Sequence, residues 1–244
     1  MKNVALKFKA PILAIYSFFL EIFFPKRCVD CGKPAEHFVC SDCIKSIEKN
    51  KTSTCPDCGK ISQSGKYCQK CKKKNGIYLT GLIAAARYEI GPLKEMVHHL
   101  KYSGITSLAE LLGELMAERL ERETLKSGLV LVPVPLHRKR EFTRGFNQAE
   151  LLARHISERL NIPGGLALTR TKNTPSQVTL SGDLRKTNLI NVFRCDDIEL
   201  ITGKTVLLID DVTTTGSTLN ECAKVLKQNG AKNVYGVVVA RRVN

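Results

Sequence analysis

Two aspartates, Asp210 and Asp211, directly follow the apolar run at residues 206–209, which has the length and β-branched composition of a buried strand. Five hydroxyl residues and one glycine come next: Thr213, Thr214, Thr215, Gly216, Ser217 and Thr218. An amphipathic segment, 219–229, then ends at Gly230, which is typical of a helix. A turn of small residues at a helix start aims backbone N–H groups at one point, with the helix dipole behind them. Such a point attracts a phosphate.

The acidic pair limits the kinds of ligand that this turn could bind. Two carboxylates at the end of the strand would repel a bare phosphate, so we expect a ligand that also carries vicinal hydroxyls, as a ribose does, or a Mg²⁺ ion. An ordinary capped helix needs one Ser or Thr, and five hydroxyls beside a tandem Asp exceed that need. Within this stretch there is no Walker A ending and no Gly-x-Gly-x-x-Gly fingerprint.

The order of a strand followed by Asp-Asp-x-x-Thr-Thr-Gly-x-Thr resembles the phosphoribosyl pyrophosphate (PRPP) loop of type I phosphoribosyltransferases. In that family the acidic pair holds the ribose 2′- and 3′-hydroxyls, and the loop holds the 5′-phosphate. The resemblance implies that Asp210 and Asp211 are the catalytic pair and that residues 214–218, with Thr213 beside them, bind the phosphate. It also implies that Mg²⁺ accompanies PRPP.

The elements that must position this site alternate between strand and helix patterns. Strands are predicted at 82–88, 129–134, 206–210 and 234–240, a short strand at 165–170, and helices at 93–102, 108–125 and 147–160. Near-continuous Val, Leu and Ile in the last two long strands is typical of parallel strands buried on both faces. The pattern predicts an α/β fold with a mostly parallel central sheet flanked by helices, and ligands at its carboxyl edge. The resemblance implies the type I phosphoribosyltransferase version of that fold.

Eight of the ten cysteines form four Cys-x-x-Cys pairs. The pairs are Cys28/Cys31, Cys40/Cys43, Cys55/Cys58 and Cys68/Cys71. Glycine follows the second cysteine of the first and third pairs, as a zinc knuckle requires. The spacing predicts two structural Zn²⁺ sites of four cysteines each, in a segment too poor in large apolar side chains to fold without metal. Sequential pairing is favoured, interleaved pairing stays open, and disulfides are the alternative.

Positive charge is concentrated in the N-terminal third. The 244-residue chain has a net charge of +15, and residues 1–77 carry 15 Lys and Arg against 6 Asp and Glu. Such an excess favours polyanionic partners, namely phosphates, nucleic acid or an acidic membrane surface. A run of lysines is either a solvated linker or a nucleic-acid contact, and its members are Lys70, Lys72, Lys73 and Lys74.

The apolar run at 11–24 holds a glutamate and has no cleavage site after it, so it indicates neither a signal peptide nor a membrane span. We predict an amphipathic helix at 12–23 that docks on the protein, with interfacial membrane contact as the less favoured alternative. The predicted organisation is a helical segment at 1–27, a double zinc ribbon at 28–75 and a phosphoribosyltransferase-like domain at 76–244. Zinc-spaced thiols without a secretory signal favour the reducing cytoplasm.

Two further stretches complete the predicted site. Residues 133–144 are predicted as a basic loop after a strand, and the transferase resemblance implies that this loop contacts pyrophosphate through Arg138, Lys139 and Arg144. A solvated basic loop is the alternative. Residues 170–193 are polar and long for a plain connection. Here the resemblance implies a lid that closes over PRPP, and its candidate residues are Arg170, Thr174, Gln177 and Arg185.

The motifs together resemble the ComF family, also called ComFC, over about residues 18–242. They are the paired Cys-x-x-Cys ribbons, Lys101-Tyr102 at a helix end, Arg-Gly-Phe-Asn-Gln at 144–148, Thr-Pro-x-Gln at 174–177 with Arg-x-x-Asn at 185–188, and the acidic loop. The resemblance implies a role in competence and natural transformation. It further implies handling of incoming single-stranded DNA, with DNA-uptake proteins as partners.

Three classes of function stay open at this point. The first is a PRPP-binding, Mg²⁺-dependent phosphoribosyltransferase that acts on single-stranded DNA. The second is a non-catalytic zinc-ribbon module that binds nucleic acid or protein and uses the PRPP site for recognition. The third is a metabolic phosphoribosyltransferase that acts on a free base. A base pocket would discriminate between them, and the sequence suggests only Lys101 and Tyr102 as residues that could line one.

Overall fold

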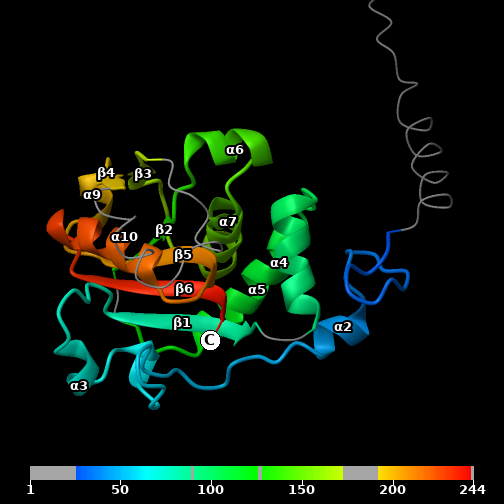
Figure 1. Cartoon of the computed structure of the whole chain (residues 1–244), viewed down its shortest axis with the longest axis horizontal. Helices are drawn as coiled ribbons and strands as arrows, with labels where there is room; N and C mark the ends of the chain where they lie inside the picture. The colour runs from blue at the N-terminus through cyan, green and yellow to red at the C-terminus, as the bar shows by residue number, and fades with distance from the viewer. Residues whose placement is uncertain (1–25, 89–90, 126–127, 173–191, 243–244) are drawn as a thin grey trace, which may run out of the picture.

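The computed structural model describes residues 26–88, 91–125, 128–172 and 192–242 (Figure 1). The helix predicted at 12–23 therefore lies outside the described residues. Among the helices that are described, none combines the length and the apolar character needed to cross a membrane.

Four parallel strands form the central sheet in the order β1 (Gly81–Arg87), β6 (Asn233–Arg241), β5 (Thr205–Thr213) and β2 (Leu129–Pro133). Their side chains are buried on both faces, as their Val, Leu and Ile content requires. The predicted parallel α/β sheet is confirmed.

Strand β5 is longer than its predicted span, which ended at residue 210. It pairs with β6 as far as Thr213, opposite Arg241, so both aspartates lie within the strand at its carboxyl end. The neighbouring strand β6 supplies the partner backbone groups, and the apolar run alone does not show where that pairing stops. This extension fixes the direction in which each aspartate points, because side chains alternate along a strand.

Helices cover the two faces of the sheet. One face packs against α4 (Pro92–Tyr102), α5 (Leu108–Glu121) and α7 (Gln148–Leu160), and the other packs against α10 (Ser217–Gln228) (Figure 1). Alternate residues of β5 divide between them, because Leu207 and Ile209 face the first group while Val206 and Leu208 face α10. Helix α5 ends at Glu121 rather than near residue 125.

The basic stretch after β2, predicted as a loop, contains a helix. Helix α6 spans Arg138–Arg144; the His137 side chain caps it by accepting from the Lys139 N–H, and Gly145 ends it at φ +83°. A short antiparallel pair, β3 (Leu168–Arg170) with β4 (Phe193–Cys195), and the one-turn helix α9 (Ile198–Ile201) lie outside the main sheet. The prediction of a plain loop was wrong because a local cap and a glycine stop sufficed for two turns of helix.

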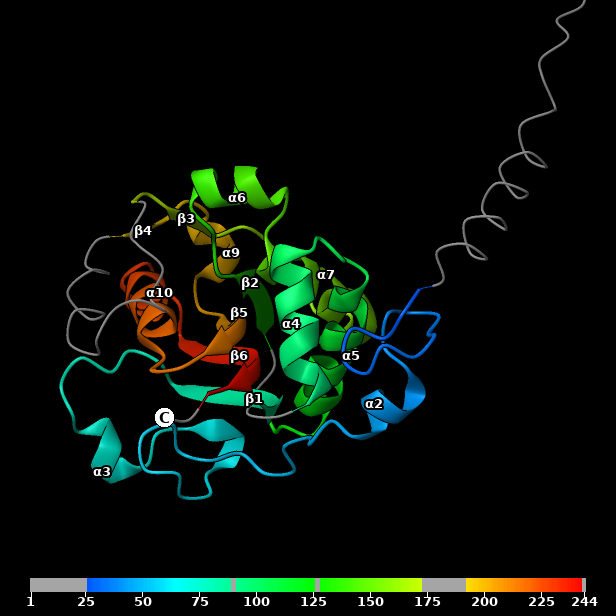
Figure 2. The same cartoon turned by 45° about the vertical axis from the view of Figure 1, so that its right-hand side comes forward.

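Two small cysteine-bearing units precede the sheet: the second lies beside β1, and the first lies beside α4 and α5 (Figures 1 and 2). The first carries α2 (Ser41–Lys45), and the second carries a 3₁₀ turn (Gln63–Gly65) and α3 (Gln69–Lys72). The segment between them pairs with the outer edge of β1: the Asn50 N–H donates to the Ala85 carbonyl at 2.8 Å, and the Arg87 N–H donates to Glu48 at 3.1 Å. An open sheet edge is thereby covered.

Candidate functional site

The two aspartates at the end of β5 face opposite sides of the sheet. Asp210 is half-buried and, by strand alternation, shares the face of Leu208 and α10. Asp211 is 2 % exposed and shares the face of Ile209, where α4 packs. The sequence predicts equal roles for the pair, but the strand gives the two carboxyls different environments.

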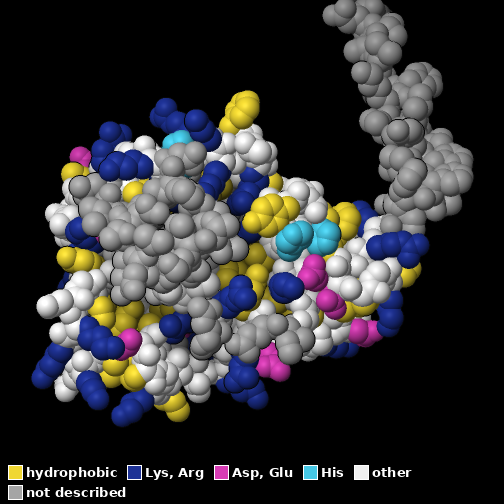
Figure 3. Space-filling model, in the orientation of Figure 1, with side chains coloured by type: hydrophobic (Ala, Val, Ile, Leu, Met, Phe, Trp, Pro, Cys, Tyr) yellow, Lys and Arg dark blue, Asp and Glu magenta, His cyan; other side chains and the backbone are white. Residues whose placement is uncertain are grey.

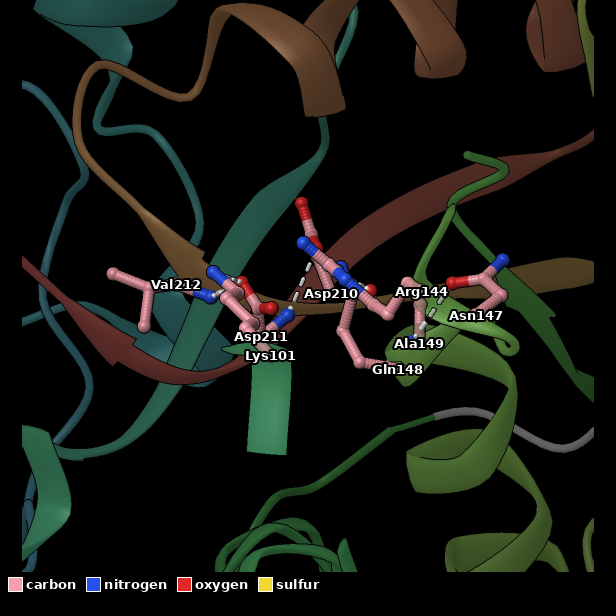
Figure 4. A network of polar contacts seen from close by, with 8 residues as sticks. All are labelled: Lys101, Arg144, Asn147, Gln148, Ala149, Asp210, Asp211 and Val212. Carbon is pink, nitrogen blue, oxygen red and sulfur yellow. Dashed lines mark hydrogen bonds and ion pairs between the residues drawn. The ribbon is translucent and has the colours of Figure 1, made fainter. Parts of the chain in front are cut away.

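Lys101, near the end of α4, forms an ion pair with Asp211. Its Nζ lies 2.8 Å from Asp211 Oδ1, which also accepts the Val212 N–H at 2.5 Å (Figure 4). Within the described residues, Asp211 Oδ2 has no hydrogen-bond partner. Burial lowers the pKa of Lys101, but the Asp211 carboxylate outweighs it, and the net shift of the pKa is upward. Lys101 is therefore held as a cation at the site.

Asp210 titrates near neutral pH. Burial is the larger cause and the charge of Asp211 the next, and together they raise the pKa of Asp210 to about 7, against a lowering influence of Lys101. A cation or hydroxyl donors that bind to a carboxyl with this pKa stabilise its ionised form. Perturbed carboxyls of this kind often mark functional sites, although structural ion pairs produce them too.

The turn after β5 combines a left-handed glycine with hydroxyl side chains. Gly216, at the N-cap of α10, has φ +75° and no side chain to cap the helix. Thr215 Oγ1 and Ser217 Oγ lie 2.7 Å apart, and the Asn220 N–H donates to the Gly216 carbonyl. Of the predicted phosphate-binding residues, those at 214–218 belong to the turn and first helical turn, whereas Thr213 is buried in the strand. A helix N-terminus entered in this way suits an anion.

Asn220 is a structural residue of the site that the sequence did not reveal. Its Oδ1 accepts the N–H groups of Tyr78 at 2.8 Å and Leu79 at 3.2 Å, and its Nδ2 donates to the Gly76 carbonyl at 2.7 Å. These bonds tie the first turn of α10 to the segment that leads into β1. A lone polar residue on an amphipathic helix gives no sequence signal for such a contact.

Arg144 lies at the end of α6 and contacts α4. Its guanidinium is 5.8 Å from the ring centre of Tyr102, the neighbour of Lys101, and its Nη1 donates to Gln148 Oε1. Asn147 caps α7 by accepting the Ala149 N–H at 3.0 Å (Figure 4). The structure thus brings Arg144 to the helix end that bears Lys101. The other two predicted pyrophosphate contacts, Arg138 and Lys139, are exposed on α6.

Of the predicted lid residues, only Arg170 is described. It is 9 % exposed and its guanidinium lies 5.6 Å from the ring centre of Phe193. Burial, and then the charge of Arg140, lower its pKa. Thr174, Gln177 and Arg185 lie outside the described residues.

The eight paired cysteines gather into two clusters. The first contains Cys28, Cys31, Cys40 and Cys43, and the second contains Cys55, Cys58, Cys68 and Cys71; within each, the sulfurs lie within 4.8 Å of one another. The pairing is sequential, as favoured from the sequence. In Cys28 and Cys55 burial acts against ionisation, but backbone N–H groups at the sulfurs lower the pKa to about 6. Four sulfurs that converge in this way fit structural zinc.

Comparison with known proteins agrees with both parts of the chain. Residues 19–72 match the family model described as a double zinc ribbon domain, and residues 147–243 match the phosphoribosyl transferase domain. The cysteine clusters lie within the first match, and strands β5 and β6 of the parallel sheet lie within the second.

Three relatives show similarity over most of their length. The chain is 37 % identical to DNA utilization protein YhgH of Escherichia coli over 86 % of this chain and 94 % of that protein. It is 32 % identical to competence protein F of Haemophilus influenzae over 90 % and 98 %. It is 28 % identical to competence protein ComFC of Bacillus subtilis over 81 % of each. With a zinc-ribbon unit, a phosphoribosyltransferase-type sheet and relatives of this similarity, the chain belongs to the competence protein F (ComF/ComFC) family.

Proposed function

We propose that the protein binds PRPP, or another ligand carrying ribose 5-phosphate, together with Mg²⁺ at the carboxyl end of β5. The observation that carries this proposal is the placement of Asp210 on the α10 face of the sheet, beside the glycine turn at 214–218. A phosphate at the turn would bring the ribose hydroxyls of the same ligand toward Asp210. The carboxylate would accept them or bind the metal.

We propose different tasks for the two aspartates. Asp210 would contact the ligand, because it is half-buried and its charge is only partly compensated. Asp211 would act mainly through Lys101, whose ammonium it holds at 2.8 Å. Lys101 and Arg144 would then place two cations at the α4–α6 end of the site, where a pyrophosphate group could bind.

Calorimetric titration of PRPP, with and without Mg²⁺, tests this proposal. Charged hydrogen bonds contribute about 1.5–3 kcal/mol each, so Asp210→Asn should weaken binding by about 10- to 100-fold. Asp42→Asn, an equal loss of charge at an exposed ribbon residue, is the matched control. Equal affinity for wild type and Asp210→Asn would contradict the proposed role of Asp210.

The pH dependence of binding gives a second readout. Since the pKa of Asp210 is about 7, affinity should increase by up to about tenfold per pH unit below 7 and level off above it. The Asp210→Asn variant should keep only the part that comes from the ligand's own phosphates. Stability should follow the opposite sign: because the folded state holds this proton more tightly, the contribution of Asp210 to stability is lost as pH rises from about 4 through 7.

We further propose that the macromolecular partner is single-stranded DNA and that the protein acts in the cytoplasm. The names of the relatives, a DNA utilization protein and two competence proteins, support the DNA partner, as does the basic N-terminal third. The reduced thiols that the zinc clusters need support the compartment. Lys70, Lys72 and Lys73 are exposed, whereas Lys74 pairs with Asp57 at 2.5 Å.

Fluorescence anisotropy across a salt series tests the DNA proposal. Binding through phosphates should give a log–log slope of about −0.7 per contact on single strands. Replacing Lys70, Lys72 and Lys73 by Ala should flatten that slope. The same change at three exposed lysines of the α/β part should leave the slope unchanged; these control residues are Lys94, Lys204 and Lys232. Absence of binding at low salt would reject single-stranded DNA as the partner.

Catalytic turnover is a separate question from binding. If the site transfers ribose 5-phosphate, PRPP should release pyrophosphate when the acceptor is present and remain intact when it is absent. Running this assay with single-stranded DNA and with free bases separates a DNA-directed enzyme from a metabolic one. Tight PRPP binding without turnover on either acceptor would favour the recognition module.

A further inference from the structure

The solvent-facing side of α4 carries a carboxylate and two imidazoles that neither the zinc ribbons nor the proposed ligand site uses. Glu95, His98 and His99 occupy positions i, i+3 and i+4 of the helix, so they share one face. Their ligand atoms all lie within 4.8 Å of one another. Figure 3 shows histidine side chains gathered beside acidic ones on this face of the molecule. Among the described residues, the two cysteine clusters are the only other groups of this kind.

Both imidazole rings are already positioned by their neighbours. His99 Nδ1 lies 2.9 Å from Ser103 Oγ, which leaves Nε2 as its ligand atom. The His98 ring lies between His99, 5.7 Å away at 85°, and Tyr102, 5.0 Å away at 48°. Such outer contacts orient metal-binding histidines in known sites and restrict the ring rotations that binding would otherwise have to stop.

Helix α4, which carries these three residues on its outer face, is firmly packed on its inner face. Its inner face contributes Leu93, Met96 and Leu100, which are at most 1 % exposed, and its last turn is held by the Lys101–Asp211 ion pair. The three ligands therefore keep a fixed spacing on the outer face. Tetrahedral bonds of about 2.0–2.1 Å separate ligand atoms by roughly 3.3 Å, so rotation of these side chains, whose ligand atoms lie within 4.8 Å of one another, can close the site.

We propose that Glu95, His98 and His99 bind a divalent transition metal of the zinc class. Two imidazoles and one carboxylate suit zinc and its neighbours, whereas Mg²⁺ prefers oxygen ligands alone. Three protein ligands leave at least one coordination position for water or for an oxygen of another molecule. In a chain of net charge +15, Glu95 supplies the negative charge that a cation needs, because its ion pair with Lys94 is long at 3.9 Å.

Metal analysis of the untagged full chain tests this third site. Protein whose cysteine clusters are filled with zinc is incubated with Co²⁺, desalted and analysed. Wild type should retain one further equivalent, with the weak visible bands of nitrogen and oxygen ligands and no added thiolate charge-transfer absorption. The double variant His98→Gln, His99→Gln should retain none. The control His155→Gln, which changes a histidine on α7, should retain it.

The outcomes separate a built site from weak surface binding. No additional Co²⁺ after desalting overturns the proposal, and so does an equivalent that persists in the double variant. Circular dichroism of both variants shows whether the helix is intact. Titration of the same variants with PRPP shows whether the ligand site at β5 is unchanged, since the metal site does not depend on that ligand site.

Discussion

The two zinc ribbons share the geometry of their first knuckle but dock on the α/β part of the protein in different ways. In the first, the Gly32 N–H donates to the Cys28 carbonyl at 3.0 Å, and in the second the Gly59 N–H donates to Cys55 at the same distance. Cys28 and Gly32 of the first ribbon lie 27 positions before Cys55 and Gly59 of the second. A repeated zinc-binding unit therefore adapts to two neighbours through the residues outside its metal site.

The first ribbon docks through apolar side chains. Val39 and Ile47 are 4 % and 8 % exposed and belong to the same buried cluster as α4 and α5. The linker continues this contact: Lys49 pairs with Glu118 at 2.6 Å. The free energy gained by burying apolar area does not depend on direction, so this docking tolerates small shifts in the position of the ribbon.

The second ribbon packs Tyr67 on the α10-side cluster and also docks through its backbone. A Cβ at Gly65 would lie 2.0 Å from the Leu82 carbonyl oxygen, and one at Gly81 would lie 2.7 Å from the Gly65 carbonyl oxygen. The contact exists only because two glycines face each other. Unlike apolar packing, such a contact has no room for adjustment.

One equivalent position displays the difference most directly. Phe38 lies 27 residues before Gly65, and their φ angles are +61° and +62°. The ribbon geometry demands a left-handed residue at both positions. The approach of β1 then excludes any side chain from the second ribbon, whereas the first uses a phenylalanine that packs on its cluster.

Removal of zinc should have the largest effect and should abolish both ribbons alike. Small zinc domains gain about 10–16 kcal/mol from their metal, so a chelator should unfold residues 28–71 whatever their docking mode. Hydrogen exchange should then accelerate at the Arg87 amide, which donates to Glu48 on the covered edge of β1. Protection of that amide without zinc would show that the linker holds the edge on its own.

Ile47→Ala should destabilise the protein by about 2–5 kcal/mol, because it truncates a buried side chain of the first ribbon. Ile61→Ala in the second ribbon is the matched control. Ile61 is 80 % exposed, so its truncation should change the free energy of unfolding by no more than about 0.5 kcal/mol. Urea denaturation measures both, and equal losses would contradict docking by side chains.

Gly65→Ala should cost about 1–3 kcal/mol and loosen the second ribbon from β1. Its control is Gly59→Ala, a residue at φ +72° with open space around the added Cβ, where only the conformational strain of about 1 kcal/mol applies. Limited proteolysis and thermal unfolding distinguish the two variants. Identical behaviour would mean that strain alone, and no contact with Leu82, accounts for the glycine.

Phe38→Gly should have the smallest effect. Relief of a positive φ favours the variant by roughly 1 kcal/mol, while loss of the partly buried ring opposes it by a similar amount. We expect the midpoint of thermal unfolding to move little in either direction. A loss as large as that of Ile47→Ala would place the ring, and not the aliphatic residues, at the centre of the first ribbon's docking.

Sequence patterns predicted the features that depend on local spacing. The four Cys-x-x-Cys pairs predicted both clusters, and Val, Leu and Ile runs predicted the parallel strands, because metal geometry and strand burial act over short stretches. Helix α6 was missed, because its cap and stop lie within a basic stretch with no apolar periodicity.

The contacts that give Asp210 and Asp211 different environments depend on tertiary structure. The end of β5 is set by its pairing with β6, and Lys101 reaches Asp211 only because α4 packs on that face of the sheet. The roles proposed for Asp210 and the residues of its turn stay predictions, as do those of the basic residues on α6. The docking of the ribbons was equally hidden, since nearly the same cysteine spacing occurs in two ribbons with unlike contacts.

The position of β1 at the edge of the sheet has a consequence for the order in which the chain can assemble. Its only neighbour among the described strands is β6, and the bond from Val234 to Thr80 spans 154 positions. During synthesis β1 therefore emerges long before its partner and must wait until residues 233–241 have been made. The ribbons and their linker emerge before β1, and the linker can cover one edge of the waiting strand, which leaves a single edge open to wrong pairing. A ribosome that stops before β6 would release a chain in which that edge is never closed.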